Sequence, residues 1–255
     1  MSSAPKLIAC AIPDIPLIES GDDIADILLS RATSAGLQFQ SGDALVVASK
    51  IVAKAEGRLM ALASVLPSPE AEALAAETGK DPRLVELILS ESQRVSRKRK
   101  GVLVTQHRLG FVSANAGIDQ SNIEGGDEAA LLLPLDPDAS ADRIRAALQG
   151  RTGVDLAVLI SDTHGRAFRV GNVGVAIGVS GLPAVQDLRG SRDLYGRALE
   201  VTQVAYADLV ASAAHLLGGE ADQGLPAVLV RGLDSRSAHG RATDMIRAAE
   251  HDLYR

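Results

Sequence analysis

The sequence predicts a mixed fold in which short buried β-strands are combined with amphipathic α-helices. Residues 156–160 form an unbroken apolar run of strand-forming residues, which is typical of a strand buried on both faces. Residues 22–35 carry apolar side chains at helical spacing, with acidic residues in the first turn and Gly36 just beyond the end. With 255 residues, of which 46% are hydrophobic, the chain is long enough to bury a substantial core.

Composition excludes several classes of protein. A net charge of -6 and an aromatic content of 2% argue against general binding to nucleic acid. Cys10 is the only cysteine, which excludes an internal disulfide and a zinc site built from several cysteines. Neither a signal peptide nor an apolar run approaching about 18 residues is present. We therefore expect a cytoplasmic protein with no nucleic-acid or membrane partner.

In the first part of the chain, residues 6–12 and 44–48 read as strands, and prolines directly after the first of them end it. The helix over residues 22–35 lies between them. If the segment after residue 48 is helical, Lys50 and Lys54 project from one face and converge on an anion. The alternative is that both lysines simply face solvent.

The middle of the chain predicts two capped helices and a hairpin. A serine followed by proline starts a helix over residues 69–78, and an aspartate followed by proline starts a second one over residues 82–90. Residues 102–105 and 111–114 are the two strands of the hairpin. Five cations lie within residues 94–100, and this run is either a solvated patch or a site for an acidic ligand.

In the second half, Ser140 is expected to cap a helix that ends at Gly150, directly before the buried strand over residues 156–160. Residues 200–217 are nearly free of charge and predict a long helix buried in the core or against another subunit. A strand over residues 227–231 and a final helix over residues 241–250 complete the prediction.

Polar side chains follow the strand over residues 156–160 directly. Asp162 and Thr163 offer oxygen ligands suited to Mg²⁺ or Mn²⁺, and Arg166 is suited to hold phosphate or carboxylate oxygens. A second loop, residues 115–126, combines small residues with further carboxylates, among them Asp119. Together the two segments predict one carboxylate metal site, although either could be an ordinary surface turn. The standard P-loop and dinucleotide-binding signatures are absent.

Several segments together resemble one known family. They are residues 48–58, 114–122, 160–166, 187–190 and 193–197. In this order they are similar to the hallmark segments of the coenzyme F420-0:L-glutamate ligases. The resemblance covers nearly the whole chain, from Ile12 to Gly232, and several motifs in the right order are far more specific than any single one.

The resemblance implies an α+β fold with two-domain subunits interlocked as a homodimer. Residues 1–255 would form a single ligase unit of two intertwined subdomains, without the flavin-binding reductase domain that is fused to some relatives. The implied reaction is GTP-dependent and joins L-glutamate to the lactyl carboxylate of F420-0, often followed by further γ-linked glutamates. It would use two divalent ions, Mg²⁺ or Mn²⁺, with K⁺ assisting. An acyl-phosphate intermediate is a hypothesis by analogy with other amide ligases.

The resemblance also implies roles for individual residues. The implied metal ligands are Asp119, Asp162, Thr163 and Glu220. The implied GTP site comprises Ile12, Pro13, Ser49, Lys50, Lys54, Asn122, Gly219, Ala221, Asp222 and Gln223. As catalytic residues we predict Lys50, Lys54 and Arg166, which would hold phosphate groups in line with the attacking carboxylate.

The chain departs from the family pattern beside Asp162. His164 stands where the family usually has an aromatic residue, and Ala167 and Phe168 replace the commoner Pro-Trp pair. These changes concern the wall that would face the acceptor. They leave open a metal-dependent ligase for a different carboxylate acceptor. A further alternative is a non-catalytic homologue that binds F420 or a nucleotide. The presence of Asp119, Asp162 and the lysine pair Lys50 and Lys54 argues against it.

Overall fold

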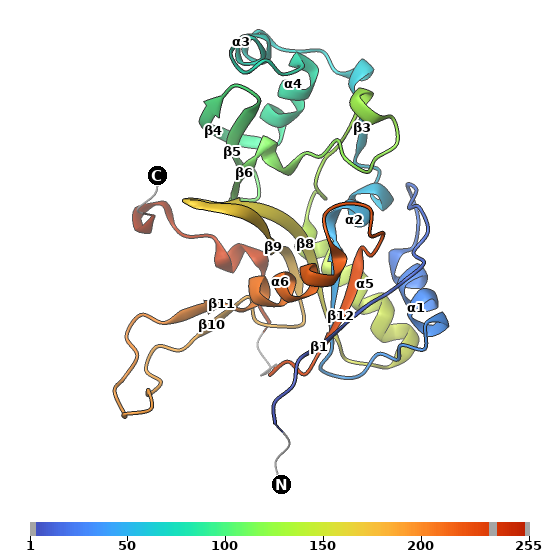
Figure 1. Ribbon diagram of the computed structural model, residues 1–255, viewed down its shortest axis with the longest axis vertical. Helices are drawn as coiled ribbons and strands as arrows, with labels where there is room; N and C mark the ends of the chain where they lie inside the picture. The colour runs from blue at the N-terminus through green and yellow to red at the C-terminus, as the bar shows by residue number, and fades with distance from the viewer. Residues whose placement is uncertain (1–3, 235–238, 253–255) are drawn as a thin grey trace.

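A five-stranded sheet forms the centre of the computed structural model, which describes residues 4–234 and 239–252 (Figure 1). Its strand order is β1 (Ile8–Ala11), β12 (Ala227–Arg231), β2 (Ala44–Ala48), β8 (Ala157–Arg166) and β9 (Arg169–Ser180). β2 and β8 are parallel, whereas the other neighbours are antiparallel. β2 and β12 have the predicted bounds, and β1 is shorter than predicted.

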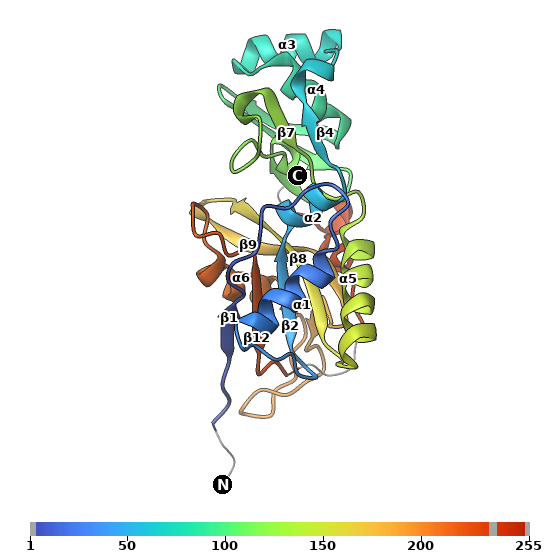
Figure 2. The same ribbon diagram turned by 90° about the vertical axis from the view of Figure 1, so that its right-hand side faces the viewer.

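Helices cover both faces of this sheet. α1 (Ile24–Ser34) and α5 (Pro137–Thr152) lie on one face, and α6 (Tyr206–Gly218) lies on the other (Figure 2). Side chains alternate along each strand, so Val47 packs with α1 and α5 while the neighbouring Val46 packs with α6. The predicted strand over residues 156–160 is accordingly buried on both faces.

A smaller region lies beyond one end of the sheet, at the top of Figure 1. It contains α3 (Pro69–Thr78), α4 (Pro82–Ser90) and a three-stranded antiparallel sheet of β4 (Ser92–Arg99), β5 (Val102–His107) and β6 (Val112–Ala114). This region has its own cluster of buried apolar side chains. The mixed α+β fold is thereby confirmed, whereas the two-domain division and the interlocked dimer stay predictions.

Two further strand pairs complete the fold. β3 (Leu59–Ala61) pairs with β7 (Ala129–Leu131), and β10 (Val185–Asp187) pairs with β11 (Gln203–Ala205) at the base of an arm that extends away from the sheet (Figure 1). Short 3₁₀ helices occur at Leu62–Ser64, Asn115–Gly117, Gly126–Glu128, Ala242–Met245 and Ala249–His251. Within the described residues, every helix is too short or too polar to cross a membrane.

Helix starts follow capping chemistry that is visible in the sequence. Ser68 and Asp81 accept hydrogen bonds from backbone amides of α3 and α4, and each is followed by proline in the first turn, as predicted. The cap predicted for α5 is wrong. Asp136 caps this helix, and Ser140 is buried one turn inside it, where its hydroxyl donates to Glu56 and to the Asp136 carbonyl oxygen.

Three predicted boundaries in the second half are also wrong. β8 continues past Ile160 through the polar residues to Arg166, because β9 supplies backbone partners along its whole length. The helix predicted over residues 200–217 begins only at Tyr206, since β11 pairs with β10 before it. Two short 3₁₀ helices replace the helix predicted over residues 241–250.

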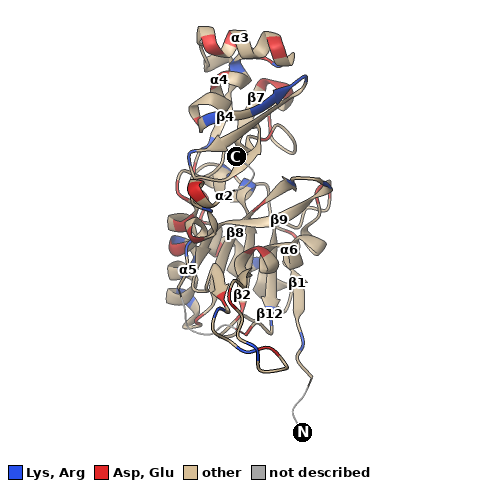
Figure 3. Ribbon diagram, turned by 90° about the vertical axis from the view of Figure 1, so that its left-hand side faces the viewer, with Lys and Arg blue, Asp and Glu red and all other residues tan. Residues whose placement is uncertain are grey.

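The cationic run over residues 94–100 lies mostly within a β-strand. It belongs to β4, whose backbone pairs with β5, and Figure 3 shows the basic residues along this strand. Charged side chains are common on edge strands, because they discourage pairing with another chain. Lys98 forms an ion pair with Glu77 at 2.7 Å, and Arg94 donates to Gln106. The run is therefore largely a solvated strand face.

The outer edge of β9 is covered by carboxylates rather than by another strand. The amide of Ala176 donates to Asp208 at 2.9 Å, and the amide of Val179 donates to Asp138 at 2.7 Å. A bulge at Ile177 turns both amides to this side of the strand. The two backbone donors are thus satisfied by side chains from the helices on either face of the sheet.

Candidate functional site

The candidate residues from distant parts of the chain meet at one edge of the five-stranded sheet. β1 and β2 end at this edge and β12 begins there, since the amide of Ile12 donates to the Ala227 carbonyl oxygen at 2.9 Å and that of Ala48 to Pro226 at 2.8 Å. Ligands of open sheets commonly bind outside the carboxyl ends of the strands. Residues that follow these strands, among them Pro13, are therefore placed together.

α2 (Ser49–Ala55) begins directly after β2 and presents the two predicted lysines on one face. Lys50 Nζ forms an ion pair with Asp119 Oδ2 at 2.7 Å, and it lies 3.1 Å from Ser121 Oγ. Lys54 Nζ donates to the Asn122 carbonyl oxygen at 3.0 Å. The loop over residues 115–126 therefore lies against α2, which brings the first predicted carboxylate to the lysine pair.

The charges in this cluster shift the titration of its members. Burial raises the pKa of Asp119, but the hydrogen bonds from Lys50 and Ser121 outweigh it and leave the pKa lowered. Burial lowers the pKa of Lys54, and the neighbouring Lys50 lowers it further, against an opposing effect of Glu124. Asp119 is consequently ionised at neutral pH, beside the ammonium group of Lys50.

The 115–126 loop holds an unusual backbone. Asn115, Ala116 and Gly117 have φ angles of 51°, 53° and 67°, in the left-handed region that costs a non-glycine residue energy. A Cβ added to Gly117 would lie 2.8 Å from Leu133 Cδ1 and 3.4 Å from Asp162 Oδ2. Only glycine fits between these two side chains without a shift, so this turn brings the loop backbone close to the second predicted carboxylate.

Asp162 lies on β8 between α2 and an imidazole. Ser49 Oγ is 3.4 Å from Asp162 Oδ1, and His164 Nε2 is 3.2 Å from Oδ2. The His164 ring packs on Phe111 with ring centroids 4.8 Å apart, and Phe111 stacks on His107 at 5.0 Å with an interplanar angle of 8°. This aromatic stack, His107–Phe111–His164, connects the smaller region to Asp162.

Thr163 points to the other side of β8 from Asp162, where it meets the segment after α6. Its Oγ1 lies 3.4 Å from Glu220 Oε2, and Glu220 Oε1 lies 2.8 Å from His215 Nε2. Thr163 and Glu220 were each predicted as metal ligands, but their contact with one another was not predicted. The imidazole beside Glu220 was not predicted.

The predicted nucleotide-binding segment over residues 219–223 is tied to the 115–126 loop. Asn122 Nδ2 donates to the Ala221 carbonyl oxygen at 3.1 Å, and the Ala221 amide donates to Gln223 Oε1 at 2.9 Å. Gly219 forms the C-cap of α6 at a φ of 69°, and Asp222 is exposed. The two loops therefore form one continuous rim around the sheet edge.

Not all predicted residues meet. Arg166 lies at the far end of β8 beside the turn into β9, where its Nη2 donates to the Val170 carbonyl oxygen at 3.4 Å. In residues 4–234 and 239–252, no three histidine, cysteine, aspartate or glutamate side chains lie close enough together to hold a metal ion. Asp119 and Asp162 each have a nitrogen donor beside one oxygen, from Lys50 and His164.

Sequence reasoning missed three contacts of this site. Ser121 donates its amide to Asp119 Oδ1 at 2.7 Å, which an Asp-x-Ser sequence within a loop could have indicated. His215 lies in the last turn of α6, and a histidine at this position, close to an acidic residue, is a recognisable signal. The sequence around Phe111 gives no signal for its role. One ring neighbour, His164, is distant in sequence, and a histidine four residues before a phenylalanine, as at His107, does not indicate a stack.

The comparisons with known proteins agree on one family. Residues 13–232 match the family described as F420-0:Gamma-glutamyl ligase. The chain is 48% identical over 246 residues to the coenzyme F420:L-glutamate ligase of Methanothermobacter thermautotrophicus, covering 96% of this chain and 97% of that protein. It is 44% identical over 259 residues to the protein of the same name from Methanopyrus kandleri, covering both chains fully. It is 41% identical over 242 residues to the coenzyme F420:L-glutamate ligase of Methanocaldococcus jannaschii, covering 95% of this chain and 94% of that protein.

Proposed function

The chain belongs to the F420-0:gamma-glutamyl ligase family, and from this we propose that it joins L-glutamate to coenzyme F420-0 and then adds further glutamates by γ-linkage. The observation that carries the proposal is the match over residues 13–232, which includes α2, the 115–126 loop, β8 and residues 219–223. The lysine pair and the acidic side chains at this edge are the groups that an amide-forming ligase driven by a nucleotide needs.

We propose GTP as the energy source, bound along α2 and the rim of the two loops. Lys50 and Lys54 lie one helical turn apart and offer ammonium groups to a polyphosphate. Burial at Lys54 strengthens its attraction for an anion, because less water screens the charge. Asn122 and the backbone around Ala221 would contact the remainder of the nucleotide. Arg166 lies at the far end of β8, so it would contact only a bound ligand that extends along this strand.

Divalent cations fit the donor set that this site offers. Asp119, Asp162, Thr163 and Glu220 present carboxylate and hydroxyl oxygens, which are the ligands that Mg²⁺ and Mn²⁺ prefer. Lys50 occupies one oxygen of Asp119, so a divalent ion bound at that oxygen would replace this ion pair. When bound, divalent ions would neutralise phosphate charge during phosphoryl transfer. K⁺ is proposed from family membership alone.

The proposed reaction has two steps. A carboxylate oxygen of F420-0 attacks the γ-phosphorus of GTP, the bond to the β-γ bridging oxygen breaks, and GDP leaves. The glutamate amine then attacks the acyl carbon, phosphate leaves, and the amine loses a proton as the amide forms. Since one acceptor oxygen departs with phosphate, ¹⁸O in the acceptor carboxylate should appear in the released phosphate. Phosphate free of the label would refute this route.

A homodimer is proposed from the arm between β10 and β11. At its tip, Leu194 and Tyr195 are 100% and 96% exposed, and near its base Val201 is 84% exposed. Apolar side chains gathered on a projecting segment are typical of a surface that packs against another chain. The exposed Leu216 on α6 adds to the apolar surface available to a second copy. Light scattering of the purified protein measures the assembly directly.

Mass spectrometry of a complete reaction tests the proposed function. The mixture contains the protein, GTP, Mn²⁺, L-glutamate and F420-0, beside parallel reactions with Asp162→Ala and with Asp26→Ala. Asp26 is an exposed carboxylate in α1, so its variant controls for loss of charge alone. We expect stepwise addition of glutamyl residues with GDP release, abolished only by Asp162→Ala. GTP hydrolysis without added mass would indicate another carboxylate acceptor. The absence of both GTP hydrolysis and added mass would refute the ligase proposal.

A further inference from the structure

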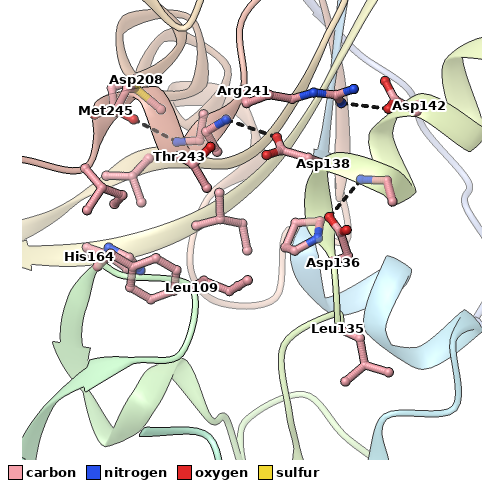
Figure 4. Close-up of a pocket in the computed structure, with 18 residues that line it drawn as sticks. Leu109, Leu135, Asp136, Asp138, Asp142, His164, Asp208, Arg241, Thr243 and Met245 are labelled. Atoms are coloured by element: carbon pink, nitrogen blue, oxygen red, sulfur yellow. Dashed lines mark hydrogen bonds and ion pairs between the residues drawn. The ribbon is translucent and has the colours of Figure 1, made fainter. Parts of the chain in front are cut away.

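A cavity of about 620 Å³ is lined by His164 (Figure 4), whose Nε2 lies 3.2 Å from Asp162 Oδ2. It is enclosed by β9, the first turns of α5, the C-terminal segment over residues 241–246 and the turn over residues 109–111. Ligand pockets for compounds of moderate size commonly have volumes of about 300–1,000 Å³. None of the metal or nucleotide contacts proposed above uses this cavity.

We propose that this cavity binds the fused heteroaromatic ring of the acceptor, so that the carboxylate end of the same molecule extends past His164 toward Asp162. The inference rests on the proposed function, because it assigns a place to one of the substrates. Three features of the cavity support it: its aromatic and apolar walls, the rigid support behind them, and the distribution of charge around it.

The walls suit a flat ring. Phe111 lines the cavity with its ring held between His107 and His164, in a chain that has only three phenylalanines and no tryptophan. Met245 and Ile246 line the cavity from the C-terminal segment, as Figure 4 shows for Met245. The edge of an aromatic ring held between two others and the polarisable methionine sulfur both pack favourably on a flat π-system.

The aromatic wall is supported from behind by a buried polar cluster. His107 is fully buried, its Nδ1 accepts the Leu109 amide at 3.0 Å, and its Nε2 faces Glu91 Oε2 at 3.4 Å. Glu91 also binds Arg58 at 2.8 Å and Arg108 at 2.9 Å. These contacts fix the plane of His107, and thereby of Phe111, before any ligand arrives. A preformed wall lowers the entropy lost on binding.

Charge around the cavity sets the orientation of the ligand. Asp138 and Asp208 each accept a backbone amide of β9 and have further oxygen lone pairs, which could accept N–H groups of a heteroaromatic ring. Arg241 lines the same cavity, but it is paired with Asp142 at 2.6 Å. The aspartates that line the cavity repel a phosphate or carboxylate group of the ligand. Lys50 and Lys54, outside the cavity, attract such a group. The ring end is therefore expected inside the cavity, and the phosphate and carboxylate groups outside it.

Equilibrium binding of F420-0, followed by the fluorescence of its own ring, tests the inference. Thr243 is exposed and lines the cavity, so Thr243→Trp would fill the space with little effect on the core. Phe111→Leu removes the stacked ring while keeping an apolar side chain. Thr33→Trp is the matched control, because this exposed threonine of α1 does not line the cavity.

We expect Thr243→Trp and Phe111→Leu to weaken F420-0 binding and to raise its KM by about tenfold or more, with the KM for GTP unchanged. Thr33→Trp should behave as wild type. If the wild type elongates F420-0 and both cavity variants bind it with wild-type affinity, the inference is wrong while the proposed function stands. If the wild type neither binds nor elongates F420-0, the proposed function fails, and the inference fails with it.

Discussion

Replacing Glu91 by glutamine should lower the free energy of unfolding by about 3 kcal/mol at pH 5 and by about half of that at pH 3. The Glu91 side chain is only 9% exposed and is shared between Arg58 and Arg108, with His107 as a third neighbour. Removing its charge leaves two guanidinium groups without their carboxylate. Glu91 therefore offers a measurable test of the support behind the aromatic stack.

The magnitude follows from the titration of Glu91. Burial alone would raise its pKa, but hydrogen bonds from His107, Arg108 and Arg58 lower the pKa from 4.5 to about 2. A pKa that is lower in the folded state adds stability that is complete above pH 4.5 and is lost as the pH falls toward 2. Each pKa unit corresponds to about 1.36 kcal/mol, which gives about 3 kcal/mol in total.

Urea denaturation of the wild type and Glu91→Gln at pH 5 and pH 3 gives the two free-energy differences. Glu72→Gln serves as the control, since Glu72 is exposed on α3 and its variant should differ from wild type by less than about 0.5 kcal/mol at both pH values. A difference for Glu91→Gln that stays the same at both pH values would refute the reasoning, because the ionised carboxylate would then contribute nothing that protonation removes.

Three further predictions concern the site and the arm. Lys54→Met should raise the KM for GTP by about tenfold and leave the KM for L-glutamate unchanged in steady-state kinetics, because only the ammonium group is removed. Gly117→Ala should lower the free energy of unfolding by about 1–3 kcal/mol in urea, since alanine meets both a positive φ and the side chain of Leu133. The double variant Leu194→Ser, Tyr195→Ser should shift the mass measured by light scattering from dimer toward monomer.

Each of these predictions has an outcome that contradicts it. A wild-type KM for GTP in Lys54→Met would remove this lysine from the nucleotide site. An unchanged denaturation midpoint in Gly117→Ala would show that Leu133 moves without cost. A double arm variant that remains dimeric would place the interface elsewhere, and a monomeric wild type would refute the dimer itself.

Much of the fold could be predicted where the signal is local. Residues 44–48 and 227–231 match β2 and β12, because each is apolar on both faces and bounded by turn residues. α3 and α4 have the predicted bounds, since Ser68 and Asp81 cap them and proline follows each cap. In these elements the residues that form the structure are neighbours in the sequence.

Elements that depend on distant partners could not be predicted. The polar residues after Ile160 remain in β8 because β9 pairs with them, and the cations of β4 form a strand because β5 lies beside them. The 115–126 loop was predicted to pair with the Asp162 segment rather than with α2, so the contact of Lys50 with Asp119 was not predicted. The aromatic stack joins the hairpin of β5 and β6, which carries His107 and Phe111, to His164 on β8, and neither segment alone indicates it.

The carboxylates along β9 limit how this protein can assemble. An exposed strand edge invites β-augmentation, in which another chain adds a strand through backbone hydrogen bonds. Asp208 and Asp138 already occupy two outward amides of β9, and a foreign strand would have to displace both. A second copy that docks at these two amides must therefore use side-chain contacts rather than extend the sheet.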